Sequence, residues 1–208
     1  ADTWLPPSHH MATGNITTYD YDLTAAANLL TSAGWVDSNG NGVRDKNGVE
    51  LVFTVAYPEG QSQRQELLAM FQADLATIGV DANVVAMPWG DLLEQARRGR
   101  LDAWTLGWYF DNRYDPAITW LLHSDSIPTA YTNHQGSNFS HWASAANDAI
   151  LDVARTELDD AALRTLYAQE VALFSQEVPF WVTSHWLRYD LTAPTLLNFQ
   201  PSAHAPAT

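Results

Sequence analysis

The sequence predicts an α/β fold in which a twisted mixed sheet is flanked by helices. Short runs rich in β-branched and aromatic residues alternate with longer segments in which apolar residues recur at helical spacing. The connections between these segments are short, and glycine follows several of the helical patterns. With 208 residues, 46% of them hydrophobic, the chain is long enough to bury a sizeable core.

The N-terminal half carries the clearest alternation. After an irregular segment over residues 1–21, we expect a helix from the N-cap Asp22 to Gly34, where glycine ends it. Turn-forming residues fill 36–50. The next elements are a strand over 51–58, a helix over 61–78, a strand over 80–88, a helix over 90–99 and a strand over 101–110. This β-α-β-α-β order predicts one sheet with helices packed on it.

The C-terminal half is expected to be mostly helical. Helical turns over 115–122 lead into a polar and aromatic loop over 123–144. Two helices follow within 145–177, and Asp159 and Asp160 are expected to cap the second of them. Extended structure resumes over 179–191, and the tail over 192–208 is expected to be loosely ordered. Because neither an internal repeat nor a linker is visible, we predict a single domain over residues 1–208.

Composition excludes several classes of function. The net charge of −14 and the lack of a basic stripe argue against nucleic acid and anionic lipid as partners. The chain contains no cysteine, which rules out disulfides, thiolate zinc sites and cysteine nucleophiles. No apolar run approaches the roughly 18 residues of a membrane helix, and no signal peptide is visible. The chain is therefore expected to be a mature form or a fragment.

One loop resembles a calcium-binding template. Four oxygen-bearing side chains occupy positions 1, 3, 5 and 9 of that template, and Gly42 stands where the loop turns sharply: Asp37, Asn39, Asn41 and Asp45. The last position, where a bidentate glutamate belongs, is Gly48, and Glu50 lies two residues beyond it. The sequence therefore leaves two interpretations open, a calcium site and a polar loop that joins a helix to a strand.

The stretch LGWYFDNRYDP, residues 106–116, places an acidic residue at the end of the third predicted strand. Ligands of open α/β sheets bind at the carboxyl ends of the strands. Asp111 is therefore a candidate to hold a cationic group, with Trp108 and Tyr109 excluding water nearby. The alternative is that Asp111 caps the helix that starts near Asp115 or stabilises the turn.

No catalytic group stands out, so we predict that the chain is not an enzyme. It contains no zinc motif, no phosphate-binding glycine loop and no nucleophile elbow. The nine tryptophans suit a ligand cleft, and one alternative is a carbohydrate-directed or hydrolytic protein in which Asp111 and Asp115 form an acid/base pair. Another alternative is an interaction domain whose aromatic surface is covered by a partner.

Three stretches together resemble family 5 of the extracellular solute-binding proteins of ABC importers, the peptide, dipeptide and nickel-binding group. They are YDYDLTAAANLLTSAGWVDSNGNGVRDKNGVELVFTV, then LLAMFQADLATIGVDANVVAMPWGDLLEQARRGRLDAWTLGW, and finally SNFSHWASAANDAILDVARTELDDAALRTLYAQEVALFSQEVPFWV. The resemblance covers roughly residues 19–184, in the order of the family's own motifs. It implies a periplasmic-binding-protein-like type II lobe, the C-terminal lobe of a two-lobed protein.

The resemblance also implies a ligand site. Peptide binders of the family hold the α-amino group of the ligand with an aspartate after Gly-Trp, which here is Asp111, and pair the peptide with backbone that here runs from Gly107 to Tyr109. Asn112 and Arg113 belong to the same stretch. Some members carry an arginine just before Gly-Trp for the peptide carboxylate, whereas this chain has Thr105 and Leu106 there. Arg113 is a possible substitute for that arginine.

The resulting expectation is a substrate-binding component of a bacterial ABC transporter that captures a peptide-like or other small solute. Its partners would be the missing N-terminal lobe of the same protein and a membrane permease. The expected location is extracellular or periplasmic, with a lipoprotein anchor in the full-length form. We expect no cofactor apart from the possible calcium ion.

Overall fold

The computed structural model describes residues 3–7, 9–12, 15–108, 116–185 and 193. These residues cluster into two compact units. We call the described residues of 20–107 and 128–135 the sheet unit, and those of 1–19, 108–127 and 136–208 the helical unit. The prediction of a single domain stays a prediction, because two units with separate buried clusters can belong to one folded domain.

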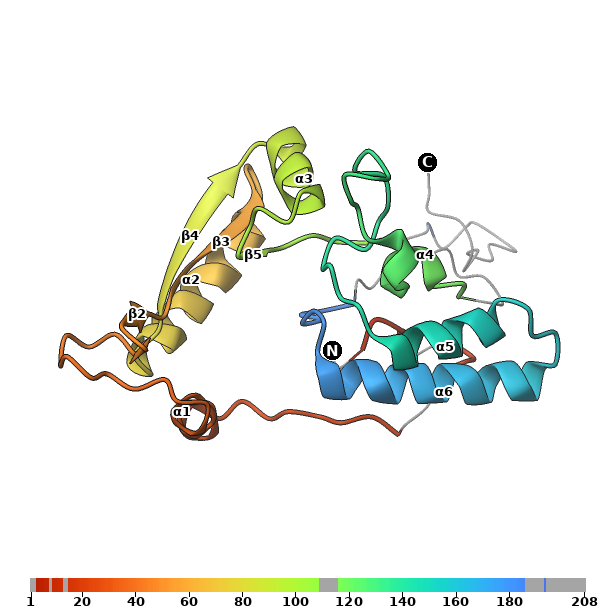
Figure 1. The fold of residues 1–208 in the computed structure, drawn as a ribbon, viewed down its shortest axis with the longest axis horizontal. Coiled ribbons are helices and arrows are strands. Elements are labelled where there is room, and N and C mark those ends of the chain that lie inside the picture. Colours follow the sequence, from red (N-terminus) through yellow and green to blue (C-terminus); the bar gives the residue numbers. More distant parts are fainter. Residues whose placement is uncertain (1–2, 8, 13–14, 109–115, 186–192, 194–208) are drawn as a thin grey trace. The chain divides into compact units, whose positions relative to one another are not determined.

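The sheet unit contains a parallel sheet whose consecutive strands are connected by helices (Figure 1). Its elements are α1 (Leu23–Ser32), β1 (Asp45–Lys46), β2 (Val49–Glu50), β3 (Val52–Pro58), α2 (Ser62–Thr77), β4 (Asp81–Met87), α3 (Trp89–Arg97) and β5 (Ala103–Trp104). β3 is the middle strand of the three, and β4 and β5 each pair with it in parallel. The predicted α/β class and the β-α-β-α-β order are confirmed.

One apolar face of α2 packs on this sheet. Leu68 is buried together with Val55 and Tyr57 of β3, and Phe71 packs against them one turn further along α2. Apolar residues three and four positions apart lie on the same side of a helix, which is why the sequence predicts this face. The predicted helix over 61–78 is confirmed.

α1 begins and ends where the sequence predicts. The Asp22 carboxylate accepts a hydrogen bond from the Ala25 amide at 2.9 Å and thereby caps the first turn. Gly34 follows the last turn with a φ of 88°, and its amide donates to the Thr31 carbonyl at 2.9 Å. Glycine adopts this left-handed conformation without strain, so the helix stops there.

The turn-rich segment over 36–50 is more regular than predicted. β1 and β2 form an antiparallel hairpin in which Asp45 lies opposite Glu50. Asn47 and Gly48 make its two-residue turn, with φ angles of 55° and 78°. Positive φ at both positions is typical of a type I′ turn, for which Asn-Gly is a preferred pair. The hairpin escaped prediction because each strand contains only two residues.

β5 is shorter than the strand predicted over 101–110. Beyond Ala103–Trp104, one further ladder bond joins the Thr105 amide to the Ala56 carbonyl at 2.9 Å. The main-chain groups of Ala56 point toward β5, and by the alternation of a strand so do those of Pro58. Proline has no N–H to donate, so the ladder ends there. Residues 109–110 of the predicted strand lie outside the described residues.

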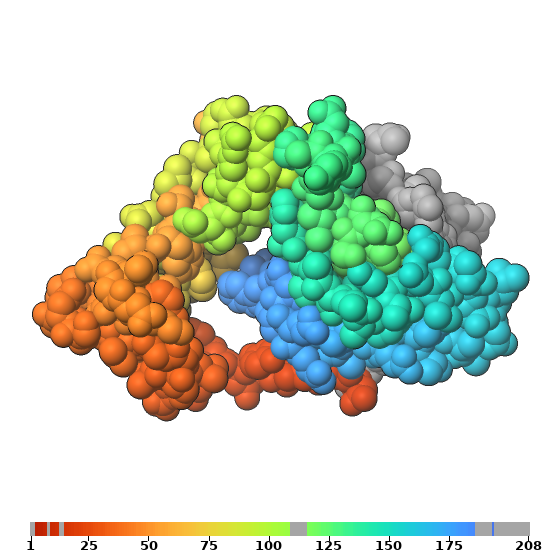
Figure 2. Space-filling model, in the orientation of Figure 1, coloured from red at the N-terminus to blue at the C-terminus, as the bar shows by residue number. Residues whose placement is uncertain are grey.

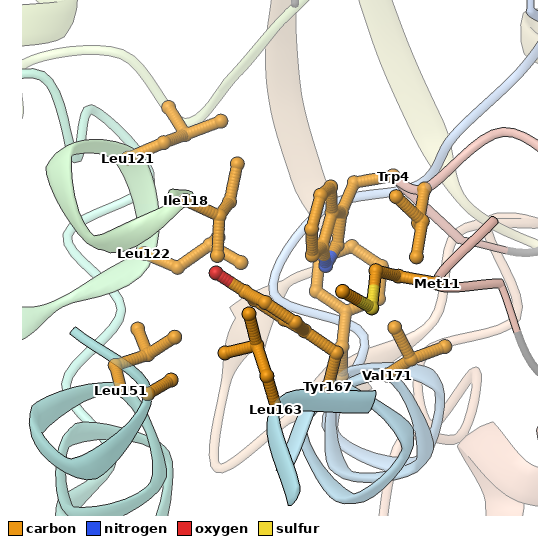
Figure 3. Packing of buried hydrophobic residues seen from close by; sticks show 12 residues of the cluster. Trp4, Met11, Ile118, Leu121, Leu122, Leu151, Leu163, Tyr167 and Val171 are labelled. Atoms are coloured by element: carbon orange, nitrogen blue, oxygen red, sulfur yellow. The ribbon is translucent and has the colours of Figure 1, made fainter. Parts of the chain in front are cut away.

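The helical unit packs its N-terminal segment against helices from the second half of the chain. Its elements are α4 (Thr119–Leu122), the 3-10 helix η1 (Ser124–Ser126), α5 (Ala145–Ala154) and α6 (Asp160–Glu177). Figure 3 shows the core, which takes Trp4 and Met11 from the N-terminal segment, Leu122 from α4, Leu151 from α5 and Val171 from α6. The predicted helices are confirmed. Asp159 caps α6 by accepting from the Ala162 amide, whereas Asp160 is the first residue of the helix and not a second cap.

Two expectations for the helical unit need correction. The segment over 123–144 was predicted to be loop, and it contains η1. Residues 179–185 were predicted to be extended, and they form no strand; instead Phe180 and Val182 pack against the core. Residues 186–191 of that prediction lie outside the described residues. Among the helices that the structure describes, none has both the length and the apolarity needed to cross a bilayer.

Candidate functional site

The carboxyl ends of the parallel strands form one edge of the sheet unit. β3 ends at Pro58, β4 ends at Met87, and the chain leaves the sheet after Thr105. Gly107 lies just beyond this end of β5 and is exposed. Ligands of open α/β sheets bind at such edges. Gly107, the first residue of the predicted ligand-binding stretch, therefore lies where a ligand is expected.

Arg64, which the sequence analysis did not single out, lies at the same edge. It belongs to the first turn of α2, and its Nε atom donates to Gln61 Oε1 at 2.6 Å. A Cβ atom on Gly107 would lie 3.1 Å from the Nη2 atom of Arg64, so the guanidinium lies against the main chain there. Glycine at position 107 leaves the space that this side chain occupies.

The charge of Arg64 has no acidic counterpart in the part of the chain that the structure describes. Arg98, Arg155 and Arg164 each pair with a carboxylate three or four positions earlier in the sequence, whereas no described carboxylate pairs with Arg64. Burial lowers the pKa of its guanidinium, which indicates partial removal from water. A half-buried arginine whose Nη donors are bonded to no described side chain is suited to bind an anionic group.

Trp108 belongs to an aromatic cluster of the helical unit. Its ring centroid lies 5.4 Å from that of Trp120 at an interplanar angle of 73°, and 5.6 Å from that of Phe139. The contact with Trp120 is edge-to-face, a geometry that stabilises a cluster beyond the area that it buries. Trp108 is half-buried at the margin of the core, and its role beside a ligand stays a prediction.

The other predicted ligand-binding residues lie outside the described residues: Tyr109, Asp111, Asn112 and Arg113. Asp115, the second carboxylate of the stretch, lies outside them as well. The anchor role of Asp111 and its alternative role as a helix cap both stay predictions.

The loop proposed for calcium lies at the surface of the sheet unit, in orange in Figure 2. The Asp37 carboxylate bonds to main-chain amides of this loop: Oδ1 accepts from the Gly40 amide at 2.7 Å, and Oδ2 accepts from the Gly42 amide at 2.9 Å. Gly42 has a φ of 90°, as expected for the sharp turn of the template. The first ligand position is thus already bonded to the loop's own amides.

The remaining oxygen atoms of the template are also engaged. The Oδ1 atoms of Asn39 and Asn41 accept from main-chain amides two residues on, both at 2.9 Å. The Asp45 carboxylate accepts from the amide and the hydroxyl of Ser38, and these bonds lower its pKa. The structure brings the four side chains into one turn-rich segment, in which Asn39 and Asn41 form Asx turns while Asp37 and Asp45 accept from more distant groups. Calcium binding stays a prediction.

No group of three or more His, Asp or Glu side chains among the described residues is arranged to hold a metal ion. One buried acid does stand out. Glu170 lies in α6 with its side chain fully buried, and burial raises its pKa to about 8. The sequence held a signal for it, because a glutamate interrupts an apolar stripe that includes Leu163, Tyr167 and Phe174.

A comparison with known families identifies the chain. The family of bacterial extracellular solute-binding proteins, family 5, matches residues 1–129 through its middle region. The chain belongs to this family. Its members are extracellular solute-binding proteins, which agrees with the resemblance found in the sequence.

Two relatives of this solute-binding chain are named for peptides. It is 28% identical over 206 residues to di/tripeptide-binding protein 1 of Pseudomonas aeruginosa, covering 97% of the chain and 35% of that protein. It is 26% identical over 167 residues to the oligopeptide-binding protein AppA of Bacillus subtilis, covering 78% of the chain and 29% of AppA. The chain therefore spans about a third of the length of these relatives.

Solved structures confirm the expected fold. AppA in complex with a nonapeptide matches with a TM-score of 0.76 at 24% identity, over 86% of this chain and 35% of that one. NikZ from Campylobacter jejuni in complex with Ni(L-His) matches with a TM-score of 0.72 at 25% identity, over 82% and 33%. The prediction of a periplasmic-binding-protein-like lobe is confirmed by these neighbours.

Proposed function

We propose that this chain is one lobe of a two-lobed protein that captures a peptide-like solute and presents it to the permease of an ABC importer. The family match over residues 1–129 carries this proposal, and two relatives named for peptide binding support it. The position of Gly107 after the carboxyl end of β5 agrees with it. The protein acts outside the cytoplasm, held at the membrane by a lipoprotein anchor.

Binding would proceed by closure of this lobe and a second lobe around the solute. The backbone that begins at the exposed Gly107 pairs with an extended peptide, as a strand adds to a sheet. Asp111 holds the α-amino group, and exclusion of water strengthens that pair. Arg64, which has no described acidic partner, offers its guanidinium to a carboxylate of the same solute. Capture requires no bond to be broken, so no catalytic group is needed.

Mass spectrometry of solutes that copurify with the complete protein tests the class of ligand. Short peptides support the proposal. A sugar, with turnover that is lost in Asp115→Asn, supports the carbohydrate alternative instead, and a metal chelate assigns the site to a third class of solute.

The anchor role of Asp111 is tested by calorimetry with the complete protein. Asp111→Asn should weaken the binding of peptides with a free amino group about 10- to 100-fold, and should leave N-acetylated peptides nearly unaffected. Asp81→Asn is the matched control, because Asp81 is an exposed carboxylate at the opposite end of β4. Equal affinities of wild type and Asp111→Asn for free-amine peptides would show that Asp111 does not bind the α-amino group.

A further inference from the structure

The N-terminal residues 3–7 and 9–12 form a strap that lies on α6 in the helical unit. Trp4, Leu5 and Met11 are buried in the core, and Figure 3 shows Trp4 and Met11 beside Tyr167 and Val171 of α6. Side chains of α6 also hold the strap through hydrogen bonds.

Two of these bonds lie well apart along α6. Arg164 donates to the His10 carbonyl, and Trp4 Nε1 donates to Glu170 Oε2 at 2.9 Å. The second bond joins two side chains that are both buried, and its acceptor is an ionisable carboxyl group.

Glu170 is an ionisable carboxylic acid in the core, and its hydrogen-bond donor, the Trp4 indole, is neutral. Its side chain is fully buried, and among the described residues its Oε1 atom has no hydrogen-bond partner. Burial raises its pKa to about 8, although the bond from Trp4 acts in the opposite direction. No charged side chain of the described residues contributes to this shift.

The other titratable groups of the elements packed here have partners of their own. His9 Nδ1 in the strap accepts from the Met11 amide at 3.2 Å, and the Tyr167 hydroxyl of α6 accepts from the Ala117 amide at 3.1 Å. Arg164 lies about one and a half turns before Glu170 and is bonded to the strap main chain. Within the described part of the chain, the pKa of Glu170 is therefore set by burial, which raises it, and by the bond from Trp4, which lowers it.

We propose that a proton on Glu170 holds the strap on α6, and that rising pH loosens the strap. Among the described residues, an ionised Glu170 carboxylate would have one neutral donor and no cation beside it, which is a costly arrangement. Release of the strap returns the carboxylate to water, where it ionises at its ordinary pKa. The docked state therefore binds a proton that the released state lacks over the pH range between the two pKa values.

The size of the effect follows from this difference in bound protons. Between the ordinary value of 4.5 and about 8, the docking equilibrium falls about tenfold for each unit of pH, and above that range it levels off. The strap is thus docked most stably below the ordinary pKa of 4.5, and this stability decreases as the pH rises toward about 8.

The same helix supplies a matched control. Glu177, in the last turn of α6, accepts a hydrogen bond from Trp142 Nε1 at 2.8 Å, so it repeats the indole–carboxylate pair at an exposed position. Removal of its charge should leave the strap unaffected, because the exposed Glu177 bonds to Trp142 and not to the strap.

Hydrogen exchange of the complete chain between pH 6 and pH 9 tests the proposal. The amides of His9 and Ala12 donate within the strap, to the carbonyls of Pro6 and His9 at 2.9 and 2.8 Å, and they report its opening. After correction for intrinsic exchange rates, their protection should fall about tenfold per pH unit in wild type and in Glu177→Gln up to about pH 8. In Glu170→Gln it should stay constant. The contributions of His9 and His10 cancel, because all three proteins contain them.

Equal pH slopes in wild type and Glu170→Gln overturn the proposal. A second measurement does not depend on that variant: the indole N–H signal of Trp4 in the unaltered chain should shift with a midpoint near pH 8. A midpoint near 4.5 would show an exposed carboxylate and would overturn it as well.

Discussion

Replacement of Arg64 by glutamine tests the unassigned cation at the edge of the sheet unit. The guanidinium lies against Gly107, and no described carboxylate neutralises it. A charge-assisted pair between arginine and a carboxylate contributes about 1.5–3 kcal/mol. Because Arg64 is only half-buried, solvent screening favours the lower part of that range, about 1.5–2 kcal/mol. Arg64→Gln should therefore weaken the binding of a free-acid peptide about 10- to 30-fold.

The assay compares two ligands that differ only in charge. Calorimetry with the complete two-lobed protein would use a peptide recovered from it and the C-terminal amide of the same peptide. Wild type should prefer the acid, and Arg64→Gln should bind both nearly equally. Arg155→Gln is the control, because it removes the same charge from an exposed ion pair with Asp152. Gly107→Ala should reduce the acid preference as well, because its methyl group would displace the guanidinium.

The result that refutes this reasoning is an acid preference that survives in Arg64→Gln. In that case the partial burial of Arg64 reflects packing against Gly107, and another cation, such as Arg113, binds the carboxylate. Binding of neither ligand by Arg64→Gln, with its urea midpoint also lowered, would point to a fold defect, and Arg64→Lys would then separate charge from packing.

Two further predictions concern the sheet unit. Arg44 bonds to the carbonyls of Ile78 and Trp35 at 2.6 and 2.8 Å, so Arg44→Met should lower the free energy of unfolding by about 2–3 kcal/mol in urea titrations. The control Arg98→Met removes an exposed arginine paired with Glu94 and should lower the free energy of unfolding by less than about 1 kcal/mol. Equal losses in the two variants would show that the bonds of Arg44 to the two carbonyls add no stability. The calcium hypothesis predicts that millimolar calcium, unlike magnesium, raises the melting temperature, and that Asp37→Asn abolishes the rise. An unchanged melting temperature in wild type would show that the loop binds no calcium and is a polar turn held by its own hydrogen bonds.

The elements that the sequence predicts well are those set by local patterns. Apolar spacing identifies α2 because Leu68 and Phe71 lie on one face, and the cap Asp22 and the stop Gly34 fix the ends of α1. β5 is predicted too long because its length depends on Pro58 of another strand, which ends the ladder. Information of that kind is absent from the segment 101–110 itself.

The candidate site is harder to predict for the same reason. Contact between Arg64 and Gly107 joins residues 43 positions apart in sequence, and only the sheet order β4-β3-β5 brings them together. Glu170 is an intermediate case, because its place in an apolar stripe is visible in the sequence. Its pairing with Trp4 spans 166 positions and is not visible there.

The division of the chain has a consequence for how the protein can be dissected. The backbone passes between the two units four times, after residues 19, 107, 127 and 135, so that one proteolytic nick at any of these points leaves them covalently tethered. The helical unit takes Trp4 and Leu5 from before the sheet unit in sequence and α4 to α6 from after most of it. No continuous stretch encodes it alone. Its recombinant form would require both segments of the sheet unit, 20–107 and 128–135, to be excised and each replaced by a linker.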